Sequence, residues 1–226
     1  FESHDVQKDG CKYIEECKSV GVCAPAGAGK TVIAQHAIHR ALEEGKRIFY
    51  TKPLKALSNQ KYYDFGEKYG QDKVGLLTGD TSINRSAQIV VMTTEVFRNM
   101  LYGTNFGAVA DNLKDVKYVV LDEVHYMNDE QRGTVWEESI IYCPTNVQII
   151  ALSATVANAD ELTDWINTVH SKTELVNTDF RPVPLRFYYF DSSQPDKLLP
   201  LLTPSGQLNK KIKPEKRQWG KHGKNK

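Results

Sequence analysis

The segment Ala24-Pro25-Ala26-Gly27-Ala28-Gly29-Lys30-Thr31 decides the fold and lies near the start of the chain. It follows an apolar run at residues 20–23 and leads into residues 32–38, whose pattern predicts a helix. A strand, a glycine-bearing turn and a helix start together predict a site for a triphosphate, because backbone N–H groups and the positive end of the helix dipole face one point. Lys30 would reach the outer phosphates, and the Thr31 hydroxyl would ligate Mg²⁺.

Two glycines suit this segment to phosphate binding. A Cβ at Gly27 or Gly29 would hinder either the turn or the approach of a phosphate to the backbone. The usual pattern for such a turn begins with glycine, and here Ala24 holds that place. A Gly-Lys-Thr helix start also arises by chance, so the prediction depends on the motifs farther along the chain.

Length and composition are those of an ordinary globular chain. At 226 residues the chain can form one large domain or two small ones. With 40% hydrophobic and 25% charged residues it can bury a core, and no apolar run reaches the length of a membrane span. We therefore expect no membrane partner. The start of the chain shows no signal-peptide pattern. Because the chain opens at Phe1 with no Met, we also expect a fragment of a longer protein.

The cysteines and the charge distribution bear on the environment of the chain. Cys11, Cys17, Cys23 and Cys143 show no C-x-x-C spacing, which predicts reduced, mostly buried thiols in a cytosolic-type compartment. Residues 207–226 hold seven lysines, one arginine and one glutamate, a balance of +7, so residues 1–206 carry −6 of the net +1. Such a basic tail can contact nucleic acid or simply be a solvated end, and the sequence does not decide between the two.

Apolar runs and helical patterns alternate along the chain. Runs that predict strands lie at residues 47–51, 74–77, 89–92, 118–121 and 147–152, and helical patterns at 55–69, 95–101, 132–141 and 160–169. The predicted strands are apolar throughout, which indicates a mostly parallel sheet covered by helices on both faces, an α/β fold of three layers. A last strand is predicted at 186–190. We place the domain at residues 1–190 and expect a poorly ordered linker or insertion with the basic tail at 191–226.

Three polar motifs follow predicted strands, at the edge where ligands bind in parallel sheets. They are the phosphate-binding turn, Asp122-Glu123 after the strand at 118–121, and Ser153-Ala154-Thr155 after the strand at 147–152. Nucleotide hydrolysis needs a metal holder and a group that orients the attacking water. Asp122 would hold Mg²⁺ through water, and Glu123 would position and polarise the attacking water, although two acids can also merely cap a turn.

Two of the remaining polar groups are ambiguous when taken alone. His125 could sense the γ-phosphate or bridge to Ser153-Ala154-Thr155, but a lone histidine is usually only a hydrogen-bonded one. The Ser-Ala-Thr sequence could equally be a plain strand-end turn. The coupling role is the one that we expect for His125, Ser153, Ala154 and Thr155.

Together these residues resemble a known family. Asp122-Glu123-Val124-His125, the phosphate-binding turn and Ser153-Ala154-Thr155 are similar to superfamily-two DExH helicases. Four longer strings are YTKPLKALSNQK at 50–61, GLLTGD at 75–80, MTTE at 92–95 and RPVPL at 181–185. They resemble the superkiller (Ski-like) group of RNA helicases. Residues 132–138 and 152–158 most resemble the cyanobacterial and chloroplast branch of that group. The resemblance covers about residues 1–190.

The resemblance implies a first RecA-like lobe that binds ATP with Mg²⁺. It implies that Phe1 stacks on adenine and Gln7 hydrogen-bonds the base edge. The strand-tracking motifs of the family match residues 52–55 and the pairs after two further strands, which gives RNA-binding roles to Pro53, Lys55, Thr78, Gly79, Thr93 and Thr94. Threonine hydroxyls, backbone N–H groups at helix starts and Lys55 can bind phosphates and ribose without reading the bases. Thr93-Thr94-Glu95 can also serve as an ordinary helix cap.

Partners and location follow from the same resemblance. The expected partners are single-stranded RNA or an RNA duplex with an overhang, and a second RecA-like lobe of the parent chain. The resemblance does not identify protein partners. The expected location is the bacterial cytoplasm or, for a plant protein, the chloroplast stroma. Two departures matter: Ala26 stands where the family usually has Thr, and nothing after residue 190 resembles the second lobe with its arginine finger. We therefore expect the chain alone to bind nucleotide weakly and to hydrolyse it slowly.

Two other functions remain open at this point. The parent could be a DNA translocase or repair helicase, because the ATP motifs are shared across the superfamily. Alternatively, the fold could serve as a binding platform for nucleotide or nucleic acid without turnover.

Overall fold

The computed structural model describes residues 5–103, 109–129, 133–190 and 197–212. Contacts divide the chain into two compact units, Phe1–Pro182 and Val183–Lys226. Phe1 itself lies outside the described residues, as do 213–226 of the basic tail. No helix in the described part of the chain is long and apolar enough to cross a membrane.

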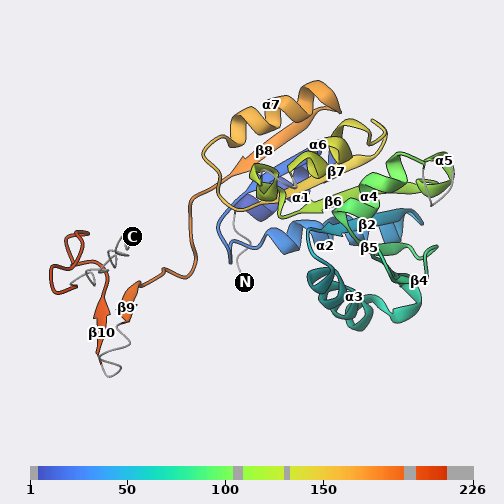
Figure 1. The fold of residues 1–226 in the computed structure, drawn as a ribbon. Coiled ribbons are helices and arrows are strands. Elements are labelled where there is room, and N and C mark those ends of the chain that lie inside the picture. The colour runs from blue at the N-terminus through green and yellow to red at the C-terminus, as the bar shows by residue number, and fades with distance from the viewer. Residues whose placement is uncertain (1–4, 104–108, 130–132, 191–196, 213–226) are drawn as a thin grey trace, which may run out of the picture. The chain divides into compact units, whose positions relative to one another are not determined.

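The first unit is built on an eight-stranded sheet with the order β4-β3-β5-β2-β6-β7-β1-β8 (Figure 1). All neighbours pair in parallel except β3 and β4, which are antiparallel. The strands, in chain order, are β1 (Ser19–Cys23), β2 (Arg47–Lys52), β3 (Val74–Leu77), β4 (Ser82–Ile83), β5 (Ile89–Thr93), β6 (Val116–Asp122), β7 (Gln148–Ser153) and β8 (Thr173–Asn177).

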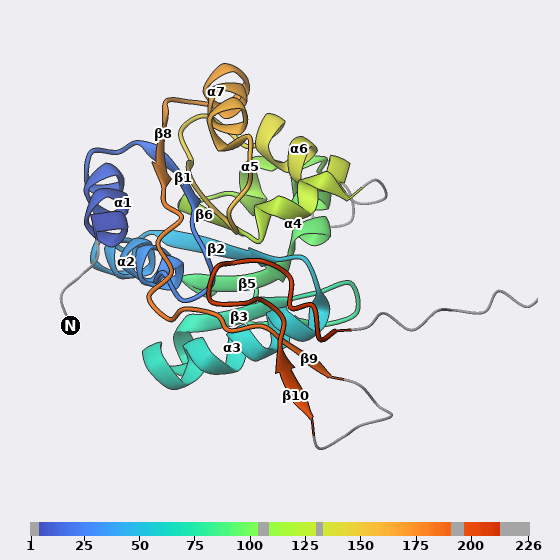
Figure 2. The same ribbon diagram turned by 90° about the vertical axis from the view of Figure 1, so that its left-hand side faces the viewer.

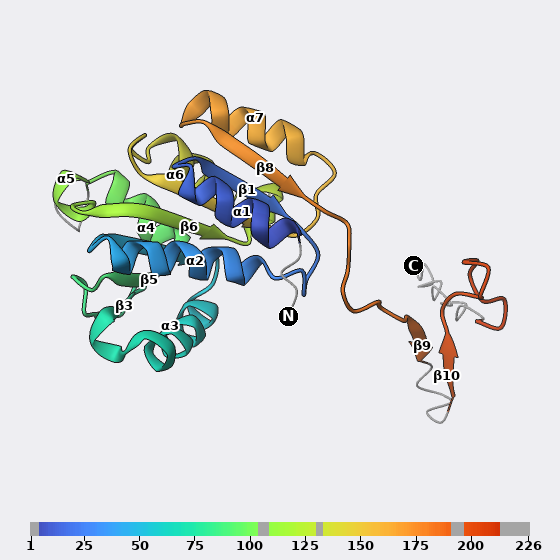
Figure 3. The same ribbon diagram turned by 180° about the vertical axis from the view of Figure 1, so that it is seen from behind.

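Helices cover both faces of this sheet, as Figures 2 and 3 show. One layer contains α1 (Asp5–Glu15), α2 (Lys30–Glu43) and α3 (Lys55–Tyr69), and the other contains α4 (Thr94–Leu101), α6 (Gly133–Ile141) and α7 (Ala159–Val169). The short elements are α5 (Val109–Asn112) and two 3₁₀ turns, η1 (Gln71–Lys73) and η2 (Val124–Asn128). The predicted three-layer α/β fold is confirmed.

Two hydrophobic clusters, one on each face, explain the uninterrupted apolar strands. In β6, Tyr118 and Val120 join the cluster under α1, α2 and α3, whereas Val119 and Leu121 join the cluster under α4, α6 and α7. Successive side chains of a strand point to opposite faces. Every strand position is therefore apolar because both faces are covered, which is the property on which the prediction relied.

The helix α1 and the strands β8 and β4 are among the elements of the sheet unit that were not predicted. The segment of α1 contains Gly10 and only two aliphatic residues, Val6 and Ile14, so few apolar positions mark it as a helix; Gly10 permits a close approach to Ile33 of α2. Only two of the five residues of β8 are buried, and β4 is a two-residue exposed edge. β8 is fixed by pairing with β1, which lies far away in the sequence, whereas β4 pairs with the nearby β3.

The second unit contains an antiparallel pair, β9 (Tyr188–Phe190) and β10 (Leu198–Pro200). The predicted last strand at 186–190 thus pairs with a segment that was expected to be a linker and does not extend the large sheet. The contact boundary follows Pro182, eight residues before the one we predicted. Pro182 lacks a backbone N–H for a ladder, which is consistent with an interruption of pairing here.

All four cysteines are free thiols, as expected, but only half of them are buried. Cys23 and Cys143 are buried, Cys11 is half-buried and Cys17 is exposed. Burial raises the pKa of the Cys143 thiol to about 12. The expectation of mostly buried thiols is corrected by Cys17, which lies in the turn after α1.

Candidate functional site

The phosphate-binding turn connects β1 to α2 at the carboxyl edge of the sheet. Gly27 and Gly29 have φ angles of 88° and 87°, a left-handed conformation that favours glycine. A Cβ at Gly27 would have no heavy atom within 4 Å, so open space lies beside the backbone there. These features fit a loop whose backbone would face a phosphate group.

Lys30, the first residue of α2, folds back over this turn. Its ammonium donates hydrogen bonds to the carbonyl oxygens of Ala24 (2.5 Å) and Pro25 (3.1 Å). Burial lowers the pKa of the Lys30 ammonium, and the carboxylates of Glu123 and Asp122 oppose that effect. Lys30 is therefore held within the turn, near the two acids, and Thr31 follows it with an exposed side chain.

Gln7, predicted to bind the adenine edge, lies against this turn. A Cβ at Gly29 would overlap the Gln7 amide, so α1 carries that amide to the turn. The close approach of Gly10 to Ile33 sets α1 on α2 and thereby brings Gln7 to this place. The predicted partner Phe1 lies outside the described residues.

Asp122 ends β6 and is surrounded by donors. Its Oδ2 accepts a hydrogen bond from the Tyr50 hydroxyl (2.6 Å) and lies 2.7 Å from the Lys52 ammonium. Its Oδ1 accepts from the backbone N–H of Glu123 (2.9 Å). Burial raises the pKa of the Tyr50 phenol well above its ordinary value, and the Asp122 charge adds to this. Tyr50 is thus a permanent donor that holds the carboxylate in place.

Glu123 adopts a left-handed backbone conformation with φ 60° and ψ 43°. Such a conformation in a non-glycine residue costs on the order of 1 kcal/mol and is typical of functional sites. Its side chain lies 3.5 Å from His125 Nδ1 and 3.9 Å from the Lys52 ammonium. The turn therefore places the Glu123 carboxylate near both the Lys52 ammonium and the His125 ring.

His125 connects the acids to the Ser153-Ala154-Thr155 turn. The backbone N–H of Ala154 donates to His125 Nδ1 (3.3 Å), and the same nitrogen lies 3.5 Å from Glu123 Oε2. The backbone N–H of Ala24 donates in turn to the Ser153 carbonyl (3.2 Å). A chain of contacts thus runs from the phosphate-binding turn through the Ser-Ala-Thr turn to Glu123.

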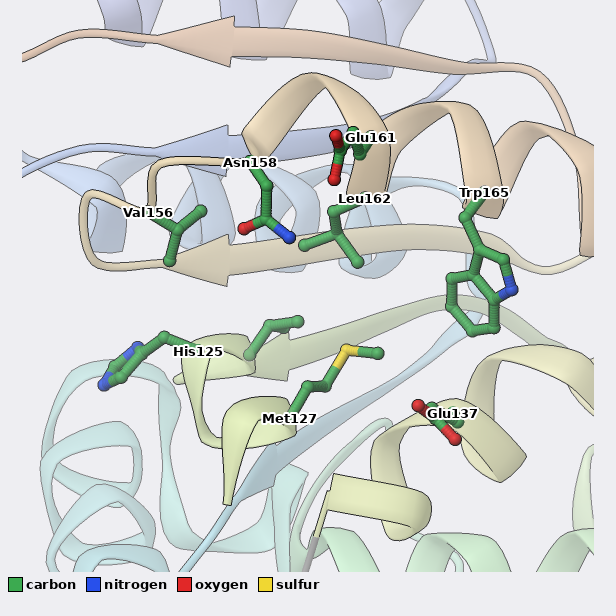
Figure 4. Close-up of a pocket in the computed structure, with 9 residues that line it drawn as sticks. His125, Met127, Glu137, Val156, Asn158, Glu161, Leu162 and Trp165 are labelled. Carbon is green, nitrogen blue, oxygen red and sulfur yellow. The ribbon is translucent and has the colours of Figure 1, made fainter. Parts of the chain in front are cut away.

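A hollow of about 270 Å³ lies beside His125, between η2 and the start of α7 (Figure 4). Met127 points toward Leu162 and Trp165 across it, and Glu137 and Glu161 supply the acidic groups of its lining. Because these charged groups are carboxylates, we assign no phosphate contact to this hollow.

A second region of the same edge contains the residues predicted to bind RNA. A groove of about 350 Å³ is lined by Pro53, Leu54, Lys55, Gly79, Asp80, Thr93 and Glu95. These residues come from the ends of β2, β3 and β5, and the register pairs Lys52 with Thr93 and Leu77 with Met92. Four of the six predicted RNA-binding residues thus line one groove, and Thr78 and Thr94 lie directly beside it in the sequence.

The helices α3 and α4 begin at this groove, so unpaired backbone N–H groups of their first turns gather there. The Thr78 hydroxyl donates to Asp80 Oδ1 (3.0 Å) and the Thr94 hydroxyl donates to the Lys52 carbonyl (3.3 Å). Thr93 occupies the N-cap position of α4 without a capping side-chain bond. The two donating hydroxyls therefore shape the groove, while Lys55 lies at its surface in an ion pair with Asp80.

The residues on the nucleotide side fit a magnesium-bound triphosphate. Thr31 and Asp122 carry oxygen atoms of the hard kind that Mg²⁺ prefers, and Mg²⁺ usually takes few ligands from protein and the rest from phosphate and water. The open space at Gly27 is the cradle that a Cβ would fill. The predicted roles of these residues in binding nucleotide and metal stay predictions.

The sequence analysis assigned no role to Tyr50 and no contact with the acids to Lys52. Both residues lie in β2, where the register places Thr51 opposite Leu121. Tyr50 and Lys52, on either side of Thr51, therefore reach Asp122. The available signal was the run Tyr50-Thr51-Lys52, three residues with polar groups that follow the apolar Ile48-Phe49 in β2. Only the strand order β2-β6 shows that these residues meet Asp122.

Comparisons with known proteins agree with this geometry. The model of the DEAD/DEAH box helicase family matches residues 4–162. The chloroplastic DExH-box ATP-dependent RNA helicase DExH15 of Arabidopsis thaliana is 55% identical over 196 residues, which are 86% of this chain and 16% of that protein. Superkiller complex protein 2 of Mus musculus is 45% identical over 196 residues, 86% of this chain and 15% of that protein. The chain thus spans about a sixth of the length of these relatives.

A solved structure is also similar. Helicase Lhr of Mycobacterium smegmatis, bound to ssDNA and AMP-PNP, aligns with a TM-score of 0.61 and 28% identity, covering 76% of this chain and 25% of that chain. The similarity bears out the predicted RecA-like fold.

Proposed function

Because the chain belongs to the DEAD/DEAH box helicase family, we propose that it is the ATP-binding lobe of a Ski-like RNA helicase. One observation carries the proposal. The nucleotide residues Lys30, Asp122 and Glu123 and the groove at Lys55 lie along one edge of one sheet, joined by adjacent strands in register. A site for ATP and a site for a single strand on one rigid layer are what an ATP-driven translocase needs.

The nucleotide side would work through positioning and charge. Lys30 would exchange its two carbonyl partners for the outer phosphates, and Thr31 and Asp122 would hold the metal. A bound Mg²⁺ would neutralise charge on the β- and γ-phosphates. Glu123, directed outward by its left-handed backbone, would orient and polarise the attacking water. Gln7 would contact the adenine edge.

The strand side would bind RNA without reading its sequence. Helix N-termini, Gly79 and Lys55 offer contacts to phosphates and sugars, which position a strand but carry no base information. Expected partners are single-stranded RNA or a duplex with an overhang, and a second RecA-like lobe supplied by the parent protein. Closure of the two lobes on ATP and RNA, followed by hydrolysis, would move the strand. The chloroplastic relative supports the predicted location, which stays a prediction.

Steady-state ATP turnover with and without single-stranded RNA tests this proposal. It would be measured on the 226-residue chain and on a longer chain that includes roughly one more domain of about 150–200 residues. We expect RNA-stimulated turnover only in the longer chain, and its loss in Glu123→Gln. If the 226-residue chain alone turned over ATP as fast as the longer chain, the second lobe would not be required.

A DNA-directed function is the second candidate, favoured by the ssDNA-bound structure of helicase Lhr. Matched RNA and DNA oligonucleotides in the same assay decide between them, since the better activator identifies the strand. A binding platform without turnover would instead show equal ATP turnover in Glu123→Gln and wild type.

A further inference from the structure

We propose that Lys52 competes with Mg²⁺ for Asp122 and thereby links the nucleotide site to the strand groove. The inference rests on the proposed function, because it assumes that Asp122 holds the metal. It assigns to Lys52 a positioning role, one that acts through the carboxylate of Asp122.

The contact between the two side chains is close and shielded from solvent. The Lys52 ammonium lies 2.7 Å from Asp122 Oδ2, and the side chains are only 12% and 10% exposed. A shielded carboxylate without a partner is costly, so this ammonium stabilises Asp122 while no metal is bound. Exposed lysine pairs elsewhere in the chain, such as Lys46 with Asp115 at 3.4 Å, are far more screened by water.

The same contact conflicts with a bound metal. Both oxygens of Asp122 already accept from protein groups, namely Tyr50 and Lys52 at Oδ2 and the Glu123 N–H at Oδ1. A divalent cation at this carboxylate would lie beside the Lys52 ammonium, and like charges at such distances repel. The neutral Tyr50 and the Glu123 N–H can remain, so Lys52 is the group that must withdraw.

The backbone shows where the released side chain can bind next. Lys52 ends β2 opposite Thr93, its carbonyl is fixed by the Thr94 hydroxyl, and Pro53 beside it lines the groove. Only the side chain needs to turn. An ammonium that leaves Asp122 at this position can meet a phosphate of a strand in the groove, so metal and strand favour the same displaced state of Lys52.

The test measures how strongly binding of a fluorescent, non-hydrolysable ATP analogue depends on Mg²⁺ in the 226-residue chain. The variants are Lys52→Gln, which removes the charge, Lys52→Arg, which keeps it, and Lys46→Gln, which removes a lysine beside the opposite end of β2. Each titration is repeated with a single-stranded RNA oligonucleotide. Thermal unfolding of each variant confirms that it is folded.

We expect Lys52→Gln to lower the half-saturating Mg²⁺ concentration roughly fivefold or more, whereas Lys52→Arg and Lys46→Gln stay near wild type. RNA should lower the Mg²⁺ requirement of wild type and leave Lys52→Gln unchanged. A Mg²⁺ requirement unaltered by Lys52→Gln would overturn the proposal and mark the pair as purely structural. Two other results would also overturn the proposal. One is that Lys52→Gln loses the same affinity for the ATP analogue at every Mg²⁺ concentration, and the other is that RNA does not change the Mg²⁺ requirement of wild type. Wild type that binds no analogue would instead refute the proposed function, and the inference with it.

Discussion

The two ends of the site differ in how their charges are held. On the nucleotide side, Asp122 is shielded and accepts from Tyr50, Lys52 and a backbone N–H, so its position is fixed before any ligand arrives. On the strand side, Lys55 and Asp80 form an exposed pair at the surface of an open groove. The hydrogen bond from Lys55, with a second from Thr78, lowers the pKa of the Asp80 carboxyl.

This difference matches the demands of the two ligands. Phosphoryl transfer needs groups preorganised around a metal and a water, whereas tracking a strand needs contacts that form and break as the strand moves. Exposed ion pairs contribute little to stability and exchange partners easily. The comparison therefore predicts strong, local effects of mutation on the nucleotide side and weaker, additive effects in the groove.

The largest expected effect separates the two sides. Lys30→Ala should weaken binding of an ATP analogue roughly 10- to 100-fold, because hydrogen bonds to charged groups are worth about 1.5–3 kcal/mol. RNA affinity without nucleotide should stay within about twofold. Fluorescence titration of each ligand checks this, with Lys46→Ala as the control. A similar loss of RNA binding in Lys30→Ala would contradict the separation of the nucleotide side from the strand side.

A moderate effect is expected in the groove. Lys55→Ala should lower affinity for single strands by roughly five- to tenfold regardless of sequence and reduce the slope of log affinity against log salt by about 0.7. Affinity for the ATP analogue should not change. The matched control is Lys68→Ala at the opposite end of α3, which should bind RNA as wild type does; a base-dependent loss in Lys55→Ala would contradict backbone tracking.

A smaller effect should measure the preorganisation of Asp122. Tyr50 is fully buried, and Tyr50→Phe removes the hydroxyl that donates a hydrogen bond to the Asp122 carboxylate. We expect the free energy of unfolding to fall by about 1 kcal/mol, as for a typical buried hydrogen bond. Urea denaturation checks this against Tyr63→Phe, whose side chain is 63% exposed and which should be neutral. Equal effects of the two variants would argue against a preorganised carboxylate.

The smallest effect concerns both sides at once. His170 is buried and lies 3.1 Å from the Pro144 carbonyl. Burial lowers the pKa of this imidazole below its ordinary 6.5, so the unfolded chain binds the extra proton first and stability should fall as pH drops through about 6.5.

Thermal unfolding across this pH range should show a shallower decline in His170→Gln than in wild type. Both ligand sites should be lost together as the unit unfolds. An unchanged pH slope in His170→Gln would show that other groups set it.

Much of the fold was predictable because its signals are local. Uninterrupted apolar runs, short connections and glycines at defined places gave the parallel sheet and the phosphate-binding turn without knowledge of contacts. The helix α1 and the strand β8 were missed because each contains only two aliphatic residues, and packing against α2 and β1 determines them. The strand at 186–190 was placed in the wrong sheet for a related reason, since a short apolar run does not name its partner.

The sequence by itself determined which chemistry is available, because residue types and spacings are covalent facts. It predicted the glycine turn with Lys30 and Thr31, the acids after β6, and the residues of the groove. Only the tertiary structure decided that Lys52 contacts Asp122, that Glu123 takes a left-handed backbone and that His125 meets Ala154. These depend on strand order and register, which arise from packing between segments distant in the sequence.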